Sequence, residues 1–328
     1  SAWSGEVARC RAPGRVAPAR GDRPVGEAED LMTTPGAIGD VAGKTILVTG
    51  ASSGIGLAAA EALAKQGARL ILVGRNRERT EAAAAQVRGA APDAQVEVEL
   101  ADQGSLAQMR ALGARLRDRL DHLDVLLNNA GAMHTSRKTT EDGFELTFGV
   151  NHLGYFVTTL ELLPLLRAAP AARVVNVASD AHSAAKLDLD DLNWERRRYG
   201  AFPVYGTSKL CNILFTRELA RRLAGTRVTA NSLHPGVVRT GFGRNDGGLL
   251  SGIVKLVGVF LISPETGAET SVYLCSSPEV DGVSGGYFAR SKQIEPRRAG
   301  RDDAAARELW TRSAEMVGVS PEGLPDPA

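Results

Sequence analysis

Short apolar stretches alternate with longer amphipathic ones from Lys44 onward. The apolar stretches have the length of buried strands and are Thr45–Thr49, Arg69–Val73, Val96–Leu100, Asp124–Asn128, Arg173–Ala178, Val228–Ser232 and Gly286–Ala289. Segments of helical length separate most of them: Leu57–Gln66, Arg77–Arg88, Ser105–Leu120, Phe144–Leu166 and Tyr205–Leu223. This rhythm predicts one doubly wound α/β domain, in which helices cover both faces of a parallel sheet.

The two ends of the chain lack this rhythm. Ser1–Pro35 is rich in Gly, Pro, Ala and Arg and contains no apolar run. We therefore expect a disordered extension over residues 1–40, one domain over residues 41–318 and a flexible tail over residues 319–328. An organellar presequence is the alternative for the extension, but its acidic residues, from Glu6 to Asp30, argue against that.

Composition excludes several classes of protein. Apolar residues make up 43% and charged residues 23% of the 328 residues, the balance of a globular domain. The net charge of +1 gives no electrostatic reason to expect a nucleic-acid partner. No segment reaches the roughly 18–20 apolar residues of a spanning helix, so we expect a soluble protein. The few cysteines and histidines are scattered without ligand spacing, which predicts no metal site and a reducing compartment, the cytoplasm.

A glycine-rich turn follows the first predicted strand and begins the first predicted helix. It reads Thr49-Gly50-Ala51-Ser52-Ser53-Gly54-Ile55-Gly56. Its glycines allow a tight turn, a close approach of the backbone and close packing of helix on strand, while the helix N-terminus offers amides to a pyrophosphate. The alternative is a turn that binds nothing. We predict a dinucleotide site.

The end of the second predicted strand indicates which dinucleotide binds. NAD enzymes of this architecture usually place a carboxylate there for the adenosine ribose. This chain has Gly74 at that position, and Arg75 and Arg77 follow. A guanidinium suits a 2′-phosphate by charge and by donor geometry, although both arginines could merely line a solvated helix start. The sequence favours NADP (NADPH) over NAD.

Tyr205-Gly-Thr-Ser-Lys209 is the strongest indication of catalysis. The i,i+4 spacing puts the phenol and the ammonium on one face of a helix. A free phenol has a pKa of about 10, and a fixed neighbouring cation lowers that pKa because it favours phenolate. Downstream of a dinucleotide turn, this pair predicts a nicotinamide-dependent oxidoreductase.

These motifs, in this order, resemble the classical short-chain dehydrogenases/reductases over residues 42–318. The resemblance is carried by the glycine turn, Asn128-Asn129-Ala130-Gly131, Asn151, Ser179, Tyr205, Lys209 and Pro235-Gly236. Five further tracts are similar to the retinol dehydrogenase branch: Asp142–Glu145, Val150–Gly154, Asp190–Asn193, Ser208–Leu210 and Leu233–Thr240. The resemblance implies a Rossmann-type fold with a seven-stranded parallel sheet in a single domain.

The resemblance also implies residue roles. Tyr205 would exchange a proton with the substrate oxygen, and Ser179 would hydrogen-bond that oxygen. Lys209 would bind the nicotinamide ribose and lower the pKa of Tyr205, while Asn151 would hold a water that links Lys209 to solvent. The implied cofactor-binding residues are Gly50, Ser52, Ser53, Gly54, Ile55, Gly56, Arg75, Glu99, Leu100, Asn128, Ala130, Gly131, Tyr205, Lys209, Pro235, Gly236, Val238 and Thr240.

The chain departs from the family pattern in two places. Glu99 stands where the family usually has an aspartate beside the adenine ring, so Glu99 and Asp102 are both candidates for that contact. The insert Asp180–Val204 separates Ser179 from Tyr205 by more residues than in compact members. A longer insert also occurs in the retinol dehydrogenase branch, and we expect it to form a flap beside the substrate cleft.

Three histidines lie near these motifs. His152 and His234 adjoin motif residues, and packing or hydrogen bonding is the favoured role of each. His182, in the insert, could face the substrate, but the sequence does not favour that role.

The segment Leu249–Ile262 is almost wholly apolar and follows the loop Pro235–Thr240, where the family places its substrate lid. A core helix, a lid and a patch in peripheral contact with a membrane are the alternatives, and the last two imply a lipophilic substrate. We predict an NADP(H)-dependent oxidoreductase of a lipophilic aldehyde, ketone or alcohol, with a homodimer or homotetramer expected from the family. The alternatives are reduction of a carbon–carbon double bond, as in protochlorophyllide reductases, and a non-catalytic dinucleotide sensor, which would need no complete tetrad.

Overall fold

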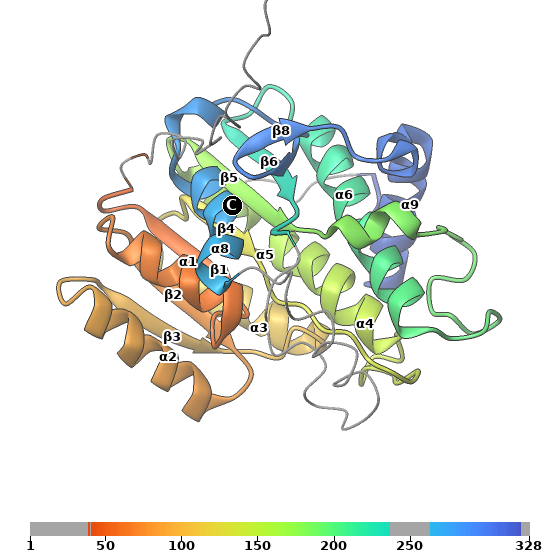
Figure 1. Cartoon of the computed structure of the whole chain (residues 1–328), viewed down its shortest axis with the longest axis horizontal. Coiled ribbons are helices and arrows are strands. Elements are labelled where there is room, and N and C mark those ends of the chain that lie inside the picture. Colours follow the sequence, from red (N-terminus) through yellow and green to blue (C-terminus); the bar gives the residue numbers. More distant parts are fainter. Residues whose placement is uncertain (1–38, 40, 237–262, 323–328) are drawn as a thin grey trace, which may run out of the picture. The chain divides into compact units, whose positions relative to one another are not determined.

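One sheet runs through the part of the chain that the computed structural model describes, namely residue 39, residues 41–236 and residues 263–322 (Figure 1). Its strands are β1 (Thr45–Thr49), β2 (Arg69–Gly74), β3 (Val96–Leu100), β4 (Val125–Asn128), β5 (Ala172–Val177), β6 (Val228–Leu233), β7 (Tyr287–Ala289) and β8 (Lys292–Ile294). The order across the sheet is β3-β2-β1-β4-β5-β6-β7-β8. The strands β1 to β7 are parallel, as predicted, and the chain crosses from one half of the sheet to the other between β3 and β4.

The sheet has an eighth strand that the sequence analysis did not predict. Strand β8 pairs antiparallel with β7 through a two-residue connection, Arg290-Ser291, in which both residues have a positive φ. Such a connection matches the twist of a hairpin and is usually built from Asn or Gly. The three-residue strand Lys292–Ile294 is exposed and does not alternate apolar with polar residues. The sequence therefore carries no strand pattern from which this hairpin could be predicted.

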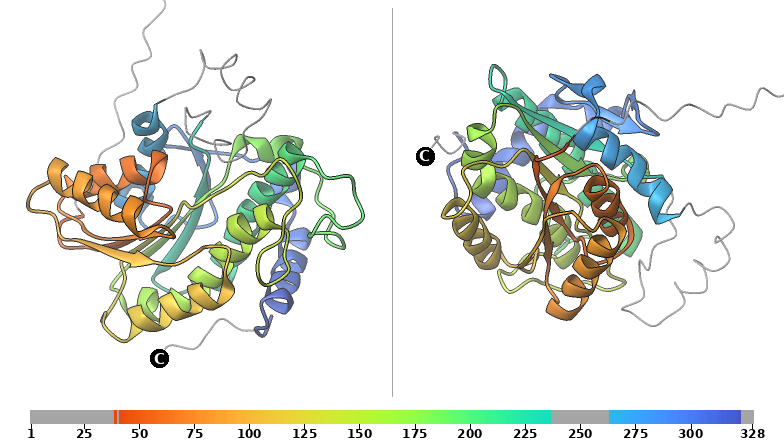
Figure 2. Two further views of the ribbon diagram at one scale, coloured as in Figure 1. Left: turned by 90° about the horizontal axis from the view of Figure 1, so that it is seen from below. Right: turned by 90° about the vertical axis from the view of Figure 1, so that its left-hand side faces the viewer.

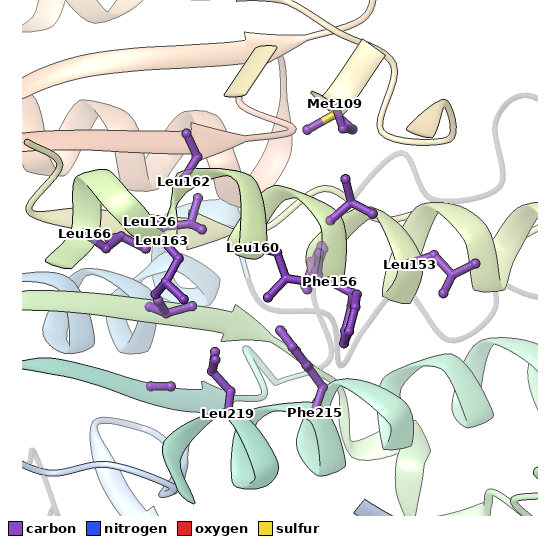
Figure 3. Close-up of a cluster of buried hydrophobic side chains, with 14 of the residues drawn as sticks. Met109, Leu126, Leu153, Phe156, Leu160, Leu162, Leu163, Leu166, Phe215 and Leu219 are labelled. Atoms are coloured by element: carbon purple, nitrogen blue, oxygen red, sulfur yellow. The ribbon is translucent and has the colours of Figure 1, made fainter. Parts of the chain in front are cut away.

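Two layers of helices cover the sheet (Figure 2). The α-helices are α1 (Gly54–Ala64), α2 (Arg77–Ala90), α3 (Leu106–Arg117), α4 (Leu146–Phe148), α5 (Gly154–Ala168), α6 (Ala201–Arg222), α8 (Pro264–Ser276) and α9 (Asp303–Met316). Helices α1, α2 and α8 pack with one face of the sheet, whereas α3, α5, α6 and α9 pack with the other. Successive residues of β1 show this division: Ile46 and Val48 belong to the first core and Leu47 to the second (Figure 3 shows part of the second).

Helices α8 and α9 were not predicted, although the sequence carries signals for both. Ser263 caps α8, whose first residue is Pro264, by accepting a hydrogen bond from the Thr266 amide at 3.3 Å. Asp302 caps α9 by accepting hydrogen bonds from the amides of Ala304 and Ala305. Ser-Pro and an N-terminal Asp at these positions are typical helix starts.

The long helix expected over Phe144–Leu166 is divided. A π-helical turn, Gly149–Leu153, separates α4 from α5. Gly149 is the first residue of this turn, and Gly154 is the first residue after it. A side chain on either would collide with a neighbour: a Cβ on Gly149 would lie 2.7 Å from Thr140, and a Cβ on Gly154 would lie 2.6 Å from Gln103. Such bulges often occur at functional sites, and this one carries Asn151.

Candidate active site

The cavity that gathers most of the predicted residues lies at the carboxyl ends of the parallel strands β1 to β6. Its volume is about 990 Å³. In an open parallel sheet, ligands bind at this edge. The lining includes Gly50, Ser52, Ser53, Gly54, Ile55, Gly56, Val73, Gly74, Arg75, Arg79, Ala101, Asp102, Gln103, Asn129, Ala130, Gly131, Ala132, Met133, His134, Ser179, Tyr205, Lys209, Pro235 and Gly236.

The glycine turn forms one wall of the cavity. Gly50 and Gly54 have φ values of 66° and 61°, in the left-handed region that favours glycine. A Cβ on Gly56 would lie 2.5 Å from the carbonyl oxygen of Gly50, so only glycine lets the helix pack this closely on the turn. Asn129 Nδ2 donates to the carbonyl of Thr49 at 2.9 Å and holds the turn from the other side. A pyrophosphate fits this cradle at the start of α1.

The four predicted catalytic residues come from three elements that meet at the cavity. Asn151 lies in the π-helical turn, Ser179 is the second residue after β5, and Tyr205 and Lys209 lie in α6. The Lys209 Nζ is 5.7 Å from the centre of the Tyr205 ring. Ser179 and Tyr205 share a side-chain hydrogen bond. Three of the four, all but Asn151, line the cavity.

Asn151 holds the surroundings of Lys209 in place. Its Oδ1 accepts from the Ala132 amide at 2.7 Å, and its Nδ2 donates to the Ala132 carbonyl and to Ser208 Oγ, each at 2.9 Å. A Cβ on Gly131 would lie 3.4 Å from Lys209 Nζ and 3.6 Å from Asn151 Oδ1, so the two side chains converge on this glycine. The Asn151 side chain therefore ties the segment after β4 to helix α6.

Burial dominates the electrostatics of the Tyr205–Lys209 pair. It lowers the pKa of Lys209 to about 7. It raises the pKa of Tyr205 to about 12, and the hydrogen bond with Ser179 acts in the opposite direction. The spacing of the two residues predicted that Lys209 lowers the pKa of Tyr205; in the structure burial raises it, and Ser179 is the group that acts against the rise. The phenol is therefore protonated at neutral pH.

The chain is similar to a known family of proteins over most of its length. A family model described as short chain dehydrogenase matches residues 44–247. The chain belongs to the short-chain dehydrogenase family. As a member, it is an oxidoreductase that acts on alcohol or carbonyl groups.

Individual relatives agree with this assignment. The chain is 44% identical to retinol dehydrogenase 13 of Homo sapiens, over 85% of this chain and 86% of that protein. It is equally 44% identical to a protein of Streptomyces sp. (strain C5) named as a daunorubicin C-13 ketoreductase, over 85% and 94% of the two chains. A crystal structure of an uncharacterized protein from Mycobacterium paratuberculosis superimposes with a TM-score of 0.72 at 33% identity, covering 88% of this chain and 97% of that one.

Among the described residues of this short-chain dehydrogenase, two arginines reach the cavity, but only one of them was predicted. Arg75 and Arg79 both line it. Arg79 Nη2 lies 3.5 Å from Ser53 Oγ in the glycine turn. Arg77 does not line the cavity and instead forms an ion pair with Glu81 at 4.0 Å. Helix α2 follows β2 and begins at this edge of the sheet, and Arg79 lies in its first turn. That position in the sequence could have identified Arg79 as a second arginine of the cavity.

Three predicted cofactor residues lie behind the cavity wall rather than on it. Glu99 forms ion pairs with Arg115 of α3 and with Arg119, which follows that helix, at 2.9 and 2.8 Å. Asn128 donates to Asn176 Oδ1 at 2.9 Å in the buried centre of the sheet. Leu100 lies at the end of β3 and does not line the cavity either.

Neighbouring residues take the corresponding places at the wall: Ala101, Asp102 and Asn129. Asp102 is thus placed where the sequence analysis offered it as the alternative to Glu99. Val238 and Thr240 lie outside the described residues, as does the segment Leu249–Ile262.

The insert Asp180–Val204 contributes to the cavity at both of its ends. Its first turn provides Ala181, Ser183 and Ala184, and Phe202 enters from the start of α6. Between these ends the buried carboxylate of Asp191 binds Arg197 at 3.0 Å, and the Tyr199 hydroxyl hydrogen-bonds the His134 carbonyl at 3.2 Å. The first contact lies within the insert, and the second joins the insert to His134 in the cavity wall.

The three histidines that the sequence places near the motifs, His152, His182 and His234, do not line the cavity. His152 is buried among aromatic rings, where burial lowers its pKa to about 3, and its Nε2 is 2.8 Å from Ser313 Oγ. Within residues 41–236 and 263–322, His, Cys, Asp and Glu side chains form no group of three that could hold a metal ion. In the same ranges, no helix combines the length and the apolar character needed to span a membrane.

Proposed function

We propose that this chain is an NADP(H)-dependent oxidoreductase of lipophilic aldehydes, ketones or alcohols, with Tyr205 as the proton donor and acceptor. The observation that carries the proposal is the convergence of Tyr205, Ser179 and Lys209 on the cavity that also holds the glycine turn. A nicotinamide cofactor supplies the hydride that reduction of a carbonyl group requires.

The protonation states of the site favour the direction of reduction. Tyr205, whose pKa is raised to about 12, carries its proton at neutral pH and can donate it to a carbonyl oxygen. Ser179 stabilises the charge that develops on that oxygen. Lys209, with a pKa lowered to about 7, can exchange protons near neutral pH and is suited to reprotonate the phenol.

The preference for NADP follows from the end of β2. Arg75 and Arg79 supply two guanidinium groups to the cavity, which suits a 2′-phosphate. A Cβ on Gly74 would lie 2.2 Å from Thr80 Oγ1, so a carboxylate at this position requires α2 to move. The site therefore favours a phosphate over a pair of ribose hydroxyls.

The substrate side of the cavity supports a lipophilic substrate. Met133, Leu146, Ala184 and Phe202 contribute apolar surface to the cavity that Tyr205 also lines. The names of the two relatives, a retinol dehydrogenase and a daunorubicin C-13 ketoreductase, agree with that chemistry.

The proposal is tested by following NADPH and NADH oxidation with a short aldehyde, a long-chain aldehyde, a bulky ketone and an α,β-unsaturated ketone. We expect turnover of the lipophilic carbonyl compounds, with NADPH preferred. Tight binding of NADPH without turnover of any compound would indicate a sensor. Reduction of the double bond alone would assign the chain to the other reductase class.

Phe202 provides a test of the substrate side, because it is 58% exposed although it lines the cavity. Phe202→Ala should raise KM for a long-chain aldehyde by up to about tenfold, since burial of part of an aromatic ring is worth roughly 1.4 kcal/mol. KM for a short aldehyde and Kd for NADPH should stay nearly constant. Ile294→Ala is the matched control, because Ile294 is also exposed but does not line the cavity. Equal effects of Phe202→Ala on both aldehydes would contradict this assignment.

A further inference from the structure

We propose that His182 is a positioning residue for catalysis: its neutral imidazole joins the turn that carries Ser179 to the C-terminal part of the sheet and so holds Ser179 against Tyr205. This inference rests on the proposed function of Ser179 and Tyr205. Its basis is the set of contacts that His182 makes away from the cavity.

His182 and its neighbours Ala181 and Ser183 lie on opposite sides of their turn. It lies in the 3₁₀ turn Asp180–Ala184, of which Ala181 and Ser183 line the cavity. The His182 side chain is only 2% exposed and packs edge-on against Tyr287 of β7, with the ring centres 5.2 Å apart. The histidine thus belongs to the inner support of the cavity wall.

Its two ring nitrogens have partners that require one particular tautomer. Nδ1 lies 2.8 Å from the carbonyl oxygen of Ser179, which can only accept, so Nδ1 carries the proton. The Tyr287 hydroxyl, 3.4 Å from the same nitrogen, can accept as well as donate and is compatible with this assignment. Nε2 lies 3.3 Å from the backbone amide of Arg297, which can only donate, so Nε2 carries none. The neutral Nδ1–H imidazole therefore bridges Ser179 and Arg297.

The bridge acts on the position of the Ser179 hydroxyl. The Ser179 carbonyl receives two hydrogen bonds from the same residue, one from the His182 ring and one from the His182 amide at 3.1 Å. The turn is also wedged against α6, because a Cβ on Gly206 would lie 2.7 Å from the Ala181 carbonyl. Removing the ring would release one side of a turn that is held directly beside Tyr205.

The groups around His182 keep it neutral. Burial lowers the pKa of His182, and Arg297 acts in the same direction. The hydrogen bond to the Ser179 carbonyl and the charge of Asp180 act in the opposite direction, but the pKa remains below its usual value. His234, after β6, and Tyr287, on β7, are the remaining titratable groups near it. A second proton would sit on Nε2 and face the Arg297 amide, so the bridge is lost only when His182 becomes charged at low pH.

The test compares His182→Asn, His182→Gln and His182→Phe with the wild type. An Asn amide can replace the Nδ1 donor, whereas Gln extends toward the Nε2 position and Phe removes both hydrogen bonds. We expect kcat for a lipophilic aldehyde to fall roughly tenfold in the Phe variant, the effect of a lost hydrogen bond that acts on the transition state. His182→Asn should recover most of kcat and His182→Gln should not, while Kd for NADPH stays unchanged in all three.

A double-mutant cycle with Ser179→Ala separates positioning from general support of the fold. Since His182 acts through Ser179, His182→Phe should lower kcat by less than about twofold in the Ser179→Ala background. An equal loss in both backgrounds, or a loss that follows melting temperature alone, would overturn the inference. If the Phe variant fails to fold, the ranking of Asn above Gln decides, and the reverse ranking overturns it. Absence of wild-type turnover would instead refute the proposed function on which the inference rests.

Discussion

Tyr205→Phe is expected to lower kcat for carbonyl reduction by at least about a hundredfold, the scale of a general acid. The substitution removes the phenol that hydrogen-bonds Ser179 and lies beside Lys209, but it keeps the ring that lines the cavity. Binding of NADPH should change little, because the glycine turn and the arginines are untouched. The measurement is single-turnover NADPH oxidation together with Kd for NADPH.

Tyr155→Phe is the matched control for this result. Tyr155 is a second buried phenol, whose ring centre lies 5.6 Å from Lys209 Nζ, but it does not line the cavity. We expect the control to keep kcat close to that of the wild type. A Tyr205→Phe enzyme that retains more than about a tenth of kcat, with chemistry shown to limit the rate, would remove Tyr205 from the role of proton donor.

Replacing Arg75 and Arg79 together by Ala should weaken NADPH binding about a hundredfold or more, since each charge-assisted contact to a phosphate is worth roughly 1.5–3 kcal/mol. Binding of NADH should change by less than about threefold, because NADH has no 2′-phosphate to lose a contact. Kd for both cofactors, measured at one fixed salt concentration, gives the comparison.

Arg77→Ala provides the control from the same helix turn. Its side chain is 74% exposed, pairs with Glu81 and does not line the cavity. It should leave both dissociation constants unchanged. Equal weakening of NADPH and NADH by the double substitution would show that the two arginines support the turn and do not select the phosphate. Gly74→Asp is a poorer test, because the new side chain would collide with Thr80 and disturb α2.

Much of the fold was predictable because its signals are local. Most of the parallel strands appear in the sequence as apolar runs of strand length and are buried, whereas the edge strand β3 alternates Val with Glu and is mostly only partly buried. The positive φ angles of Gly50 and Gly54 are conformations that glycine adopts readily, so the turn could be inferred from residue types. The i,i+4 spacing of Tyr205 and Lys209 depends only on the helix that contains them.

The same local reasoning failed where a contact between distant segments decides the conformation. At the π-helical turn that carries Asn151, Thr140 and Gln103 pack closely against two glycines. The helical periodicity of the sequence gives no information about these contacts. Glu99 was a candidate for the cofactor by its place in the chain, but Arg115 of helix α3 and Arg119, which follows that helix, bind its carboxylate.

The sequence by itself determined the fold class, the family motifs and the types of residue that carry the chemistry, because each of these depends on short-range periodicity or on residue type. The tertiary structure alone decided which side chains face the cavity: Arg79 and not Arg77, Asn129 and not Asn128, Asp102 and not Glu99. It also decided that burial, which no spacing reveals, raises the pKa of Tyr205 and lowers that of Lys209. The side of an element that a side chain faces, and the extent to which it is buried, are set only when the strands and helices pack. Both depend on neighbours that are remote in the chain.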